Sequence, residues 1–361
     1  MSPERFSPHP PKLPYKFLTP QEADHFLTHG WLKVPNAIIP EYIDAWMGDF
    51  WVRTGGDEHD KTTWKDEYQH LPHHRQVRHD QFCPEAWQKI SDICGGEERI
   101  HLERERWIGD NFIVNFGSEA RSKSQVETSP KEKKGWHFDN DWYRQFLDSS
   151  GTAMTIIHCF TDIPAHGGGT WLCEDGLAGV IQHLYDHPEG LDPGLNNGDV
   201  CNDIIKSCEE FTSVVAKKGD VFILHGLLPH VASFNYLHYA RVITNPHVTL
   251  KEPYNLNRPD GDYSLLEQVI LRGLDRQSVP EYEPTRDRMY WYPRNWTFKE
   301  AKIRDELDAM IAAAKAKGLD EKAVDSIWLK GEQARKDFDE RNGLLLPVHE
   351  EAGLQLSQHK L

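Results

Sequence analysis

A histidine and an aspartate two residues apart limit what this chain can build around them. His137 and Asp139 lie in the segment Trp136-His-Phe-Asp-Asn-Asp. On an extended chain, residues i and i+2 point to the same side, whereas helical neighbours recur at three or four residues. If this segment is a strand or a strand end, an imidazole and a carboxylate face one point. These are two ligands of the set that leaves half of an octahedral iron(II) open. The alternative is a surface histidine beside an acidic loop.

The third ligand is expected about ninety residues downstream. Gly219-Asp220 is a turn signal, and residues 221–224 form a short apolar run that predicts a buried strand. His230 follows and would begin the next strand. Arg241 comes eleven residues later and opens another β-branched run. An iron site that chelates a 2-oxo diacid needs a planar, two-pronged donor for the far carboxylate, and arginine has this geometry.

These motifs resemble the phytanoyl-CoA dioxygenase-like family of iron(II)/2-oxoglutarate-dependent oxygenases. The similarity rests on W-H-x-D at 136–139, on G-D-V-x-x-x-H-x-L-L-x-H at 219–230 and on the spacing between His230 and Arg241. It covers roughly residues 20 to 250. Two departures, Phe138 and the run 231–233, bear on the substrate more than on the chemistry.

The resemblance implies an α+β fold with a double-stranded β-helix (jelly-roll, cupin-like) core flanked by N- and C-terminal helices. We expect one catalytic domain over residues 1–361. Residues 1–106 would form an N-terminal helical part with the first strand, residues 107–252 the core that carries the metal site, and residues 253–361 a C-terminal helical extension.

The resemblance also assigns roles to individual residues. It implies Fe(II) bound by His137, Asp139 and His230, with 2-oxoglutarate and O2 as cosubstrates. Other candidates are Arg241, Thr170 and Asn115 for the cosubstrate, and Trp142, Tyr143, Arg144, Leu344 and Leu346 for the substrate. Several have structural alternatives: Asn115 as a strand-edge residue, the aromatic residues as packing under the barrel lip, and the apolar segment 343–347 as a core anchor.

The implied function is a dioxygenase that oxidises an unactivated C–H bond of a small metabolite. The outcome would be hydroxylation, desaturation or oxidative ring formation, in secondary metabolism, with an amino acid or similar small acid as one substrate class. A carboxylate at Asp139 disfavours halogenation. Two alternatives stay open: a jelly-roll protein that binds metal or ligand without turnover, and a cupin-type metal-dependent hydrolase or isomerase. Neither requires a guanidinium like that of Arg241.

Composition and charge disfavour some classes of binding partner. The chain has 41 basic and 57 acidic residues and a net charge of −16, which disfavours nucleic acid as a partner. No apolar run is long enough to cross a membrane, and residues 1–14 are Pro-rich without a signal-peptide core. Six scattered cysteines are expected to be reduced. We therefore expect a cytoplasmic enzyme with a small-molecule substrate. Oligomeric state is not predicted.

Further patterns predict local structure. Helices are expected over residues 19–30, 40–52, 84–94, 298–317 and 321–342, a strand over 106–116, and an irregular excursion over 188–203. The His-rich segment 54–79 includes His70, His73, His74 and His79, but it supplies no cysteine and no regular ligand spacing. We therefore predict no zinc site there.

Overall fold

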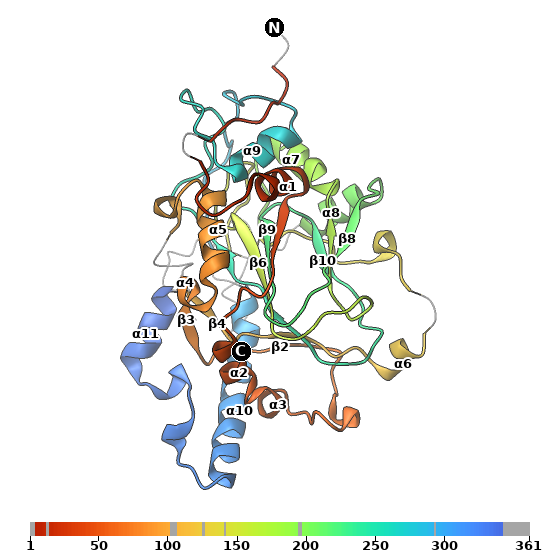
Figure 1. The fold of residues 1–361 in the computed structure, drawn as a ribbon, viewed down its shortest axis with the longest axis vertical. Helices are drawn as coiled ribbons and strands as arrows, with labels where there is room; N and C mark the ends of the chain where they lie inside the picture. Colours follow the sequence, from red (N-terminus) through yellow and green to blue (C-terminus); the bar gives the residue numbers. More distant parts are fainter. Residues whose placement is uncertain are drawn as a thin grey trace.

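A computed structural model describes residues 4–341 except 12–13, 102–106, 125–126, 141, 194–196 and 292–293. Figure 1 shows antiparallel sheets at the centre with helices around them. The helices are α1 (Pro20–His29), α2 (Pro40–Met47), α3 (Phe50–Thr54), α4 (His79–Phe82), α5 (Pro84–Cys94), α6 (Glu119–Ser122), α7 (Gly176–Asp186), α8 (Asn197–Ile205), α9 (Leu265–Gly273), α10 (Arg294–Ala316) and α11 (Glu332–Arg341). The expected mixture of helix and antiparallel sheet is confirmed.

A seven-stranded sheet forms the centre of the molecule, with strand order β1-β9-β6-β11-β5-β2 and β12 paired to β6. A second sheet has the order β10-β7-β8, and β3 pairs with β4. The strands are β1 (Trp31–Val34), β2 (Tyr68–His70), β3 (Gln76–Arg78), β4 (Trp107–Gly109), β5 (Ile113–Asn115), β6 (Met154–Cys159), β7 (Thr170–Cys173), β8 (Phe211–Ser213), β9 (Val221–His225), β10 (His230–Ala232), β11 (Arg241–Thr244) and β12 (His247–Val248).

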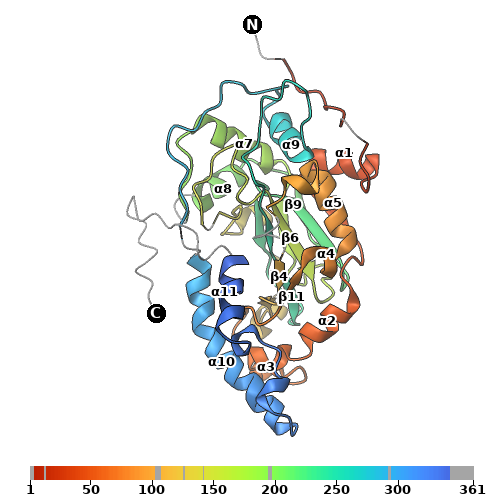
Figure 2. The same ribbon diagram turned by 90° about the vertical axis from the view of Figure 1, so that its left-hand side faces the viewer.

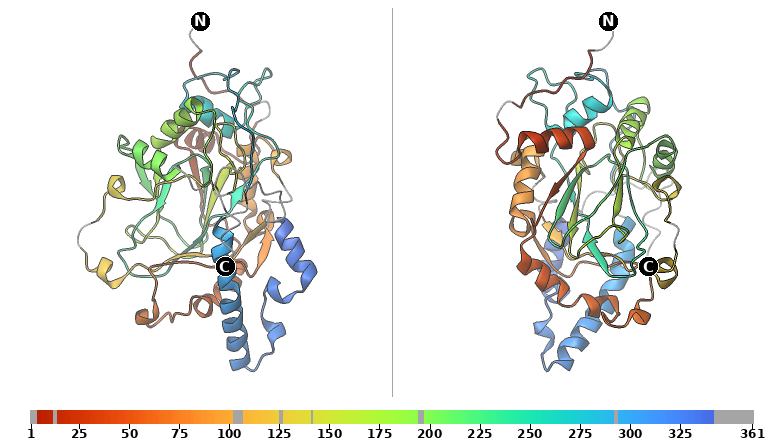
Figure 3. Two further views of the ribbon diagram at one scale, coloured as in Figure 1. Left: turned by 180° about the vertical axis from the view of Figure 1, so that it is seen from behind. Right: turned by 45° about the vertical axis from the view of Figure 1, so that its right-hand side comes forward.

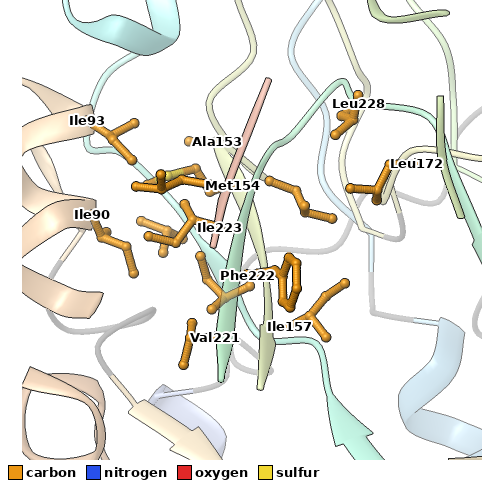
Figure 4. Packing of buried hydrophobic residues seen from close by; sticks show 14 of the residues in the cluster. Ile90, Ile93, Ala153, Met154, Ile157, Leu172, Val221, Phe222, Ile223 and Leu228 are labelled. Carbon is orange, nitrogen blue, oxygen red and sulfur yellow. The ribbon is translucent and has the colours of Figure 1, made fainter. Parts of the chain in front are cut away.

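The two faces of the large sheet pack against different neighbours. Along β6, alternate side chains point to opposite faces because the strand repeat is two residues. Figure 4 shows Met154 on the side of Ile90 and Ile93 from α5, whereas Ile157 lies on the other side with Leu172 of the small sheet. All of β6 is buried. The outer face is thus covered by helices, and the inner face looks towards the small sheet.

Helices α4 and α5 lie along the outer face of this sheet (Figure 2). The first helix, α1, begins as predicted: the Thr19 side chain accepts from the backbone N–H of Glu22, and the Glu22 side chain accepts in return from Thr19. It ends at Gly30, which has φ of 75°. The strand β1 then starts directly and pairs with β9.

Four element predictions need correction. The predicted helix 40–52 is two helices, α2 and α3, separated near Gly48. The excursion 188–203 contains α8, whose buried Cys201 and Ile205 face the core. The predicted helix 321–342 begins as two short 3-10 turns, Glu321–Ala323 and Ile327–Leu329, and only α11 is α-helical.

The fourth correction concerns the predicted strand 106–116, which is divided into β4 and β5 at the buried Asp110. Its carboxylate accepts from the backbone N–H groups of His74 and Arg75, both at 2.8 Å, and from the Arg53 and Arg75 guanidinium groups at 2.9 and 3.0 Å. Arg53 also donates to Glu306 of α10 at 2.9 Å. This buried network interrupts the strand and fastens α10 to the body of the protein.

Helix α10 extends away from the sheets at the end opposite the N-terminus, with α11 beside it (Figure 3). Among the described helices, none is both long and apolar enough to span a bilayer. The six cysteines are buried and form no disulfide, as predicted for reduced thiols.

Replacing the central carboxylate of the buried network should destabilise the fold. In Asp110→Asn, the Arg53 and Arg75 guanidinium groups each lose one of their carboxylate partners. Breaking a buried ion pair costs about 3–5 kcal/mol. Urea unfolding should show this loss. The matched Asp308→Asn change removes an exposed ion pair on α10 and should cost less than about 1 kcal/mol. Equal stability of the two variants would contradict a structural role for the network.

Candidate functional site

A backbone pairing brings the two predicted histidine ligands together. The N–H of His137 donates to the carbonyl of His230 at 3.1 Å, and the N–H of His230 donates back at 2.8 Å. This isolated antiparallel bridge sets the two rings side by side, with centroids 4.6 Å apart. One ligand atom from each of His137, Asp139 and His230 lies within 4.8 Å of the others. The three predicted metal ligands therefore converge on one point.

Backbone carbonyls orient both imidazoles. His137 Nδ1 lies 2.7 Å from the Gly135 carbonyl oxygen, and His230 Nδ1 lies 2.9 Å from that of Leu228. A carbonyl can only accept, so each Nδ1 carries the hydrogen, and in the neutral ring Nε2 keeps its lone pair. Both Nε2 atoms lie 3.6 Å from an oxygen of Asp139. Three candidate ligand atoms thus face one point and could hold a cation.

The Asp139 carboxylate is held by two further side chains. The Thr155 hydroxyl donates to Oδ2 at 3.0 Å, and His247 Nε2 lies 3.1 Å from the same oxygen. Burial alone would raise the pKa of Asp139, but His230 and His247 outweigh it and keep this pKa well below its usual range. Burial would lower the pKa of His230, whereas Asp139 raises it more. The carboxylate is therefore ionised and available as a ligand at neutral pH.

Arg241 is buried with a relative exposure of 1% and has no carboxylate partner among the described residues. Its Nε donates to the Gly168 carbonyl at 2.8 Å, and Nη1 donates to the Ile113 carbonyl at 3.3 Å. Its Nη2 is buried without a hydrogen-bond partner in the described part of the chain. Burial lowers the pKa of Arg241 to about 10, so it stays charged at neutral pH. An interior cation with a free donor is suited to an incoming anion.

Strand pairing sets Arg241 on the face of the sheet that supports the metal ligands. Ile243 of β11 pairs with Cys159 of β6, and a period of two relates Ile243 to Arg241 and Cys159 to Thr155. Arg241 and Thr155 therefore share the inner face. Their neighbours Thr244 and His158 are also paired, and they point to the outer face.

Tyr68, Asn115 and Arg241 form a row across β2, β5 and β11, because Asn115 pairs with both of the others. The Asn115 amide donates to the Ser233 carbonyl at 3.0 Å, and its oxygen accepts from Gly117 N–H at 3.0 Å. The Tyr68 hydroxyl also donates to the Ser233 carbonyl, at 3.2 Å. Asn115 thus ties the chain after β10 to β5, and both of these side-chain hydrogen bonds are to backbone atoms of the protein.

The glycine turn before Thr170 approaches the Arg241 side chain. Gly168 has φ of 75°, and a Cβ there would lie 2.6 Å from the Asn115 amide nitrogen. Only glycine fits, and this lets the Gly168 carbonyl reach Arg241. Thr170 follows as the first residue of β7, is buried, and pairs with Ala232 of β10.

The substrate candidates that follow Asp139 line a cavity of about 470 Å³. Trp142 stacks on Tyr290 with centroids 5.7 Å apart, and the Tyr143 hydroxyl donates to Gln145 at 2.7 Å. Arg144 is buried and donates to Asp192 at 2.5 Å. An acidic substrate would therefore compete with Asp192 for this cation. Leu344 and Leu346 lie outside the described residues.

Sequence reasoning missed three residues of the site. Thr155 and His247 support Asp139, and Tyr68 lies in the row with Arg241. Thr155 lies in β6, and its direction towards Asp139 depends on strand pairing. The sequence has no motif that marks Tyr68, which lies in the polar segment before the core.

The chain matches no family model and no curated protein. Partial similarity is found to solved structures. One is the epimerase SnoN in complex with Fe3+, alpha ketoglutarate and nogalamycin RO, with 14% identity over 74% of this chain and 93% of that chain, and a TM-score of 0.37. Another is HygX from Streptomyces hygroscopicus with nickel, 2-oxoglutarate and hygromycin B, with 12% identity, coverage of 65% and 88%, and a TM-score of 0.36.

A third is the non-heme alpha ketoglutarate dependent carbocyclase SnoK from nogalamycin biosynthesis, with 13% identity, coverage of 67% and 87%, and a TM-score of 0.33. These identities and scores are low. The functional proposal therefore depends on the residues of this chain, above all on the cluster of His137, Asp139 and His230 and on Arg241.

Proposed function

We propose that this protein is an Fe(II)/2-oxoglutarate-dependent dioxygenase with a double-stranded β-helix core, and that it oxidises an unactivated C–H bond of a small metabolite. The metal ligands are His137, Asp139 and His230. Arg241 binds the distal carboxylate of 2-oxoglutarate. This assignment keeps the chemistry that the motifs predict and extends it with the supporting residues Thr155 and His247.

The observation that carries the proposal is the unpaired Nη2 of Arg241. A buried cation without a counterion is unfavourable unless a ligand supplies the missing charge. A carboxylate suits this position because a guanidinium can bind it with two parallel hydrogen bonds. The cation shares the inner face of the large sheet with Thr155, which holds Asp139. A ligand with a chelating keto acid at one end and a carboxylate at the other fits both requirements.

The ligand set fits iron(II). Two imidazole nitrogens and one carboxylate are the facial set that leaves coordination positions open for other ligands. When bound, iron(II), 2-oxoglutarate and O2 together supply the oxidant for the substrate C–H bond, with succinate and carbon dioxide as coproducts. His137 keeps 43% of its side chain exposed, so the cluster can be reached from outside.

The protein's own task is orientation. Gly135 and Leu228 fix the two imidazoles, Thr155 and His247 fix the carboxylate, and the Gly168 carbonyl positions Arg241 through its Nε. Such supporting contacts commonly change metal affinity or activity by one to two orders of magnitude. We propose that the substrate approaches beside Trp142 and Tyr143, which come three and four residues after Asp139 in the chain.

Arg241 distinguishes the proposed oxygenase from two other possible functions. A binding protein without turnover would take up metal but would not convert 2-oxoglutarate. A metal-dependent hydrolase or isomerase would act without any 2-oxoglutarate. Neither gives a reason to bury a guanidinium with a free nitrogen on the inner face, so we favour the oxygenase.

Asp139→Ala should abolish turnover because it removes the only carboxylate from the ligand cluster. The measurement is succinate formation from 2-oxoglutarate with iron(II) and oxygen, first without and then with candidate metabolites. Asp308→Ala, on the exposed surface of α10, should keep wild-type turnover. Full activity of Asp139→Ala would remove Asp139 from the ligand set.

Arg241→Met should raise the KM for 2-oxoglutarate by about 30-fold or more, since losing one partner of a buried charge pair costs about 2–5 kcal/mol. Arg241→Lys keeps the charge but loses the planar fork of the guanidinium. Its KM for 2-oxoglutarate should therefore lie between those of the wild type and Arg241→Met. Iron affinity, measured by titration without 2-oxoglutarate, should change little in both variants. An unchanged KM in Arg241→Met would refute the carboxylate-binding role.

Thr155→Val should weaken iron binding by about 10- to 100-fold, because it removes a hydrogen bond that orients the Asp139 carboxylate. Thr155→Ser keeps the hydroxyl and should restore most of the affinity. Binding can be followed by titrating Fe(II) under anaerobic conditions. If valine and serine gave the same affinity as threonine, the hydroxyl would have no part in holding Asp139.

A further inference from the structure

A second group of metal-binding side chains lies on the outer face of the large sheet. His158 projects from β6, on the face opposite Thr155. His79 begins α4, and Cys83, four residues after His79, comes directly after the last residue of that helix. All three residues are buried, with relative exposures of 0%. One ligand atom from each lies within 4.8 Å of the others.

The distances resemble those between ligands of one cation. His79 Nε2 and His158 Nε2 are 3.1 Å apart, and Cys83 Sγ lies 3.7 Å from His158 Nε2. For tetrahedral zinc with Zn–N of about 2.0–2.1 Å and Zn–S of about 2.3 Å, the corresponding edges are about 3.3 Å and about 3.6 Å. The two imidazoles are inclined by 82°, so the contact between them is not a stack.

Hydrogen bonding alone leaves this cluster poorly satisfied. Without a cation, His79 Nε2 and His158 Nε2 share one hydrogen, and the Cys83 thiol lies 3.7 Å from both His158 Nε2 and the His79 carbonyl oxygen, a long contact in each case. His79 Nδ1 is buried and has no partner among the described residues. His158 Nδ1, in contrast, contacts the Thr244 hydroxyl at 3.1 Å, as the second nitrogen of a ligating histidine commonly does.

The electrostatic setting also suits a cation. Burial lowers the pKa of His79 to about 3 and that of His158 well below its usual range, so both rings are neutral and can act as ligands. Burial raises the pKa of the Cys83 thiol, and a metal would have to displace its proton to solvent. Asp80 is close enough for its charge to raise the pKa of both His79 and Cys83.

We propose that His79, Cys83 and His158 bind one d10 cation, Zn2+ or Cu+, at a closed structural site separate from the catalytic centre. A thiolate ligand favours these soft or borderline ions, whereas iron(II) suits the two histidines and one carboxylate of the other cluster. Cu+ with one thiolate is neutral, whereas Zn2+ leaves one positive charge that Asp80 would partly offset. Three protein ligands are sufficient for Cu+, whereas tetrahedral Zn2+ would take a fourth ligand such as water. Because none of the three ligands is exposed, a substrate could not reach the ion.

The site would fasten the junction of α4 and α5 to the centre of the sheet. His158 belongs to the same strand as Thr155, which holds Asp139 on the other face. A metal at the outer site would therefore restrain β6 just behind the catalytic ligands. Metal binding of this kind adds directly to folding stability.

The test uses the full-length His137→Ala/Asp139→Ala variant, in which the catalytic cluster is removed. Elemental analysis after dialysis against a weak chelator should find about one equivalent of zinc or copper per chain, and which of the two is found distinguishes them. After the metal is stripped, added Co2+ should give the visible bands of a tetrahedral site and a near-ultraviolet thiolate-to-cobalt transition. Absence of both the retained metal and the thiolate transition would overturn the proposal.

A matched pair of variants identifies the thiolate. Cys83→Ser in the same background should lose the transition, whereas Cys173→Ser/Cys208→Ser should keep it, although Cys173, Asp175 and Cys208 form another cluster. The reverse pattern would assign the metal to that cluster and refute the site at Cys83. If Cys83→Ser does not fold, His158→Gln gives a second test through the metal content, which should fall from about one equivalent to about zero.

Discussion

The alternation of side chains along β6 and β11 determines what each face of the large sheet can do. Thr155 and Arg241 point inwards, and they contact Asp139 and the Gly168 carbonyl. His158 and Thr244 point outwards and contact each other at 3.1 Å. A register shift of one residue on either strand would exchange these sets. Both chemical sites therefore depend on one pairing, Ile243 with Cys159.

Two buried arginines, Arg53 and Arg241, differ in how completely their guanidinium groups are paired. Arg53 is surrounded by the carboxylates of Asp110 and Glu306 and by two backbone carbonyls. Arg241 has only the carbonyls of Gly168 and Ile113, and one of its nitrogens has no described partner. The first arrangement is complete without a ligand. The second leaves a desolvated donor in place, and a bound carboxylate would gain that interaction with little reorganisation.

The motifs predicted the core of the site but not its supports. The two-residue spacing on an extended chain put His137 and Asp139 on one side, and the downstream motif with its family resemblance added His230. Thr155 and His247 could not be found in this way, since they reach Asp139 through strand pairing between distant segments. The predicted helix 19–30 matches α1, whose capping residues Thr19 and Glu22 are three residues apart in sequence, whereas α8 was missed because its Asn/Gly-rich start looked like a loop.

The outer cluster of His79, Cys83 and His158 also could not be predicted from local sequence. The His-rich segment contained no cysteine and therefore predicted no zinc site, yet His79 and Cys83 are one helical turn apart and His158 comes from a strand far along the chain. Ligand chemistry would keep the two sites distinct. A carboxylate and a partly exposed imidazole give an open site for a hard or borderline ion that must accept further ligands. A thiolate with two fully buried imidazoles gives a closed site, so a metal bound there would hold β6 in place without taking part in turnover.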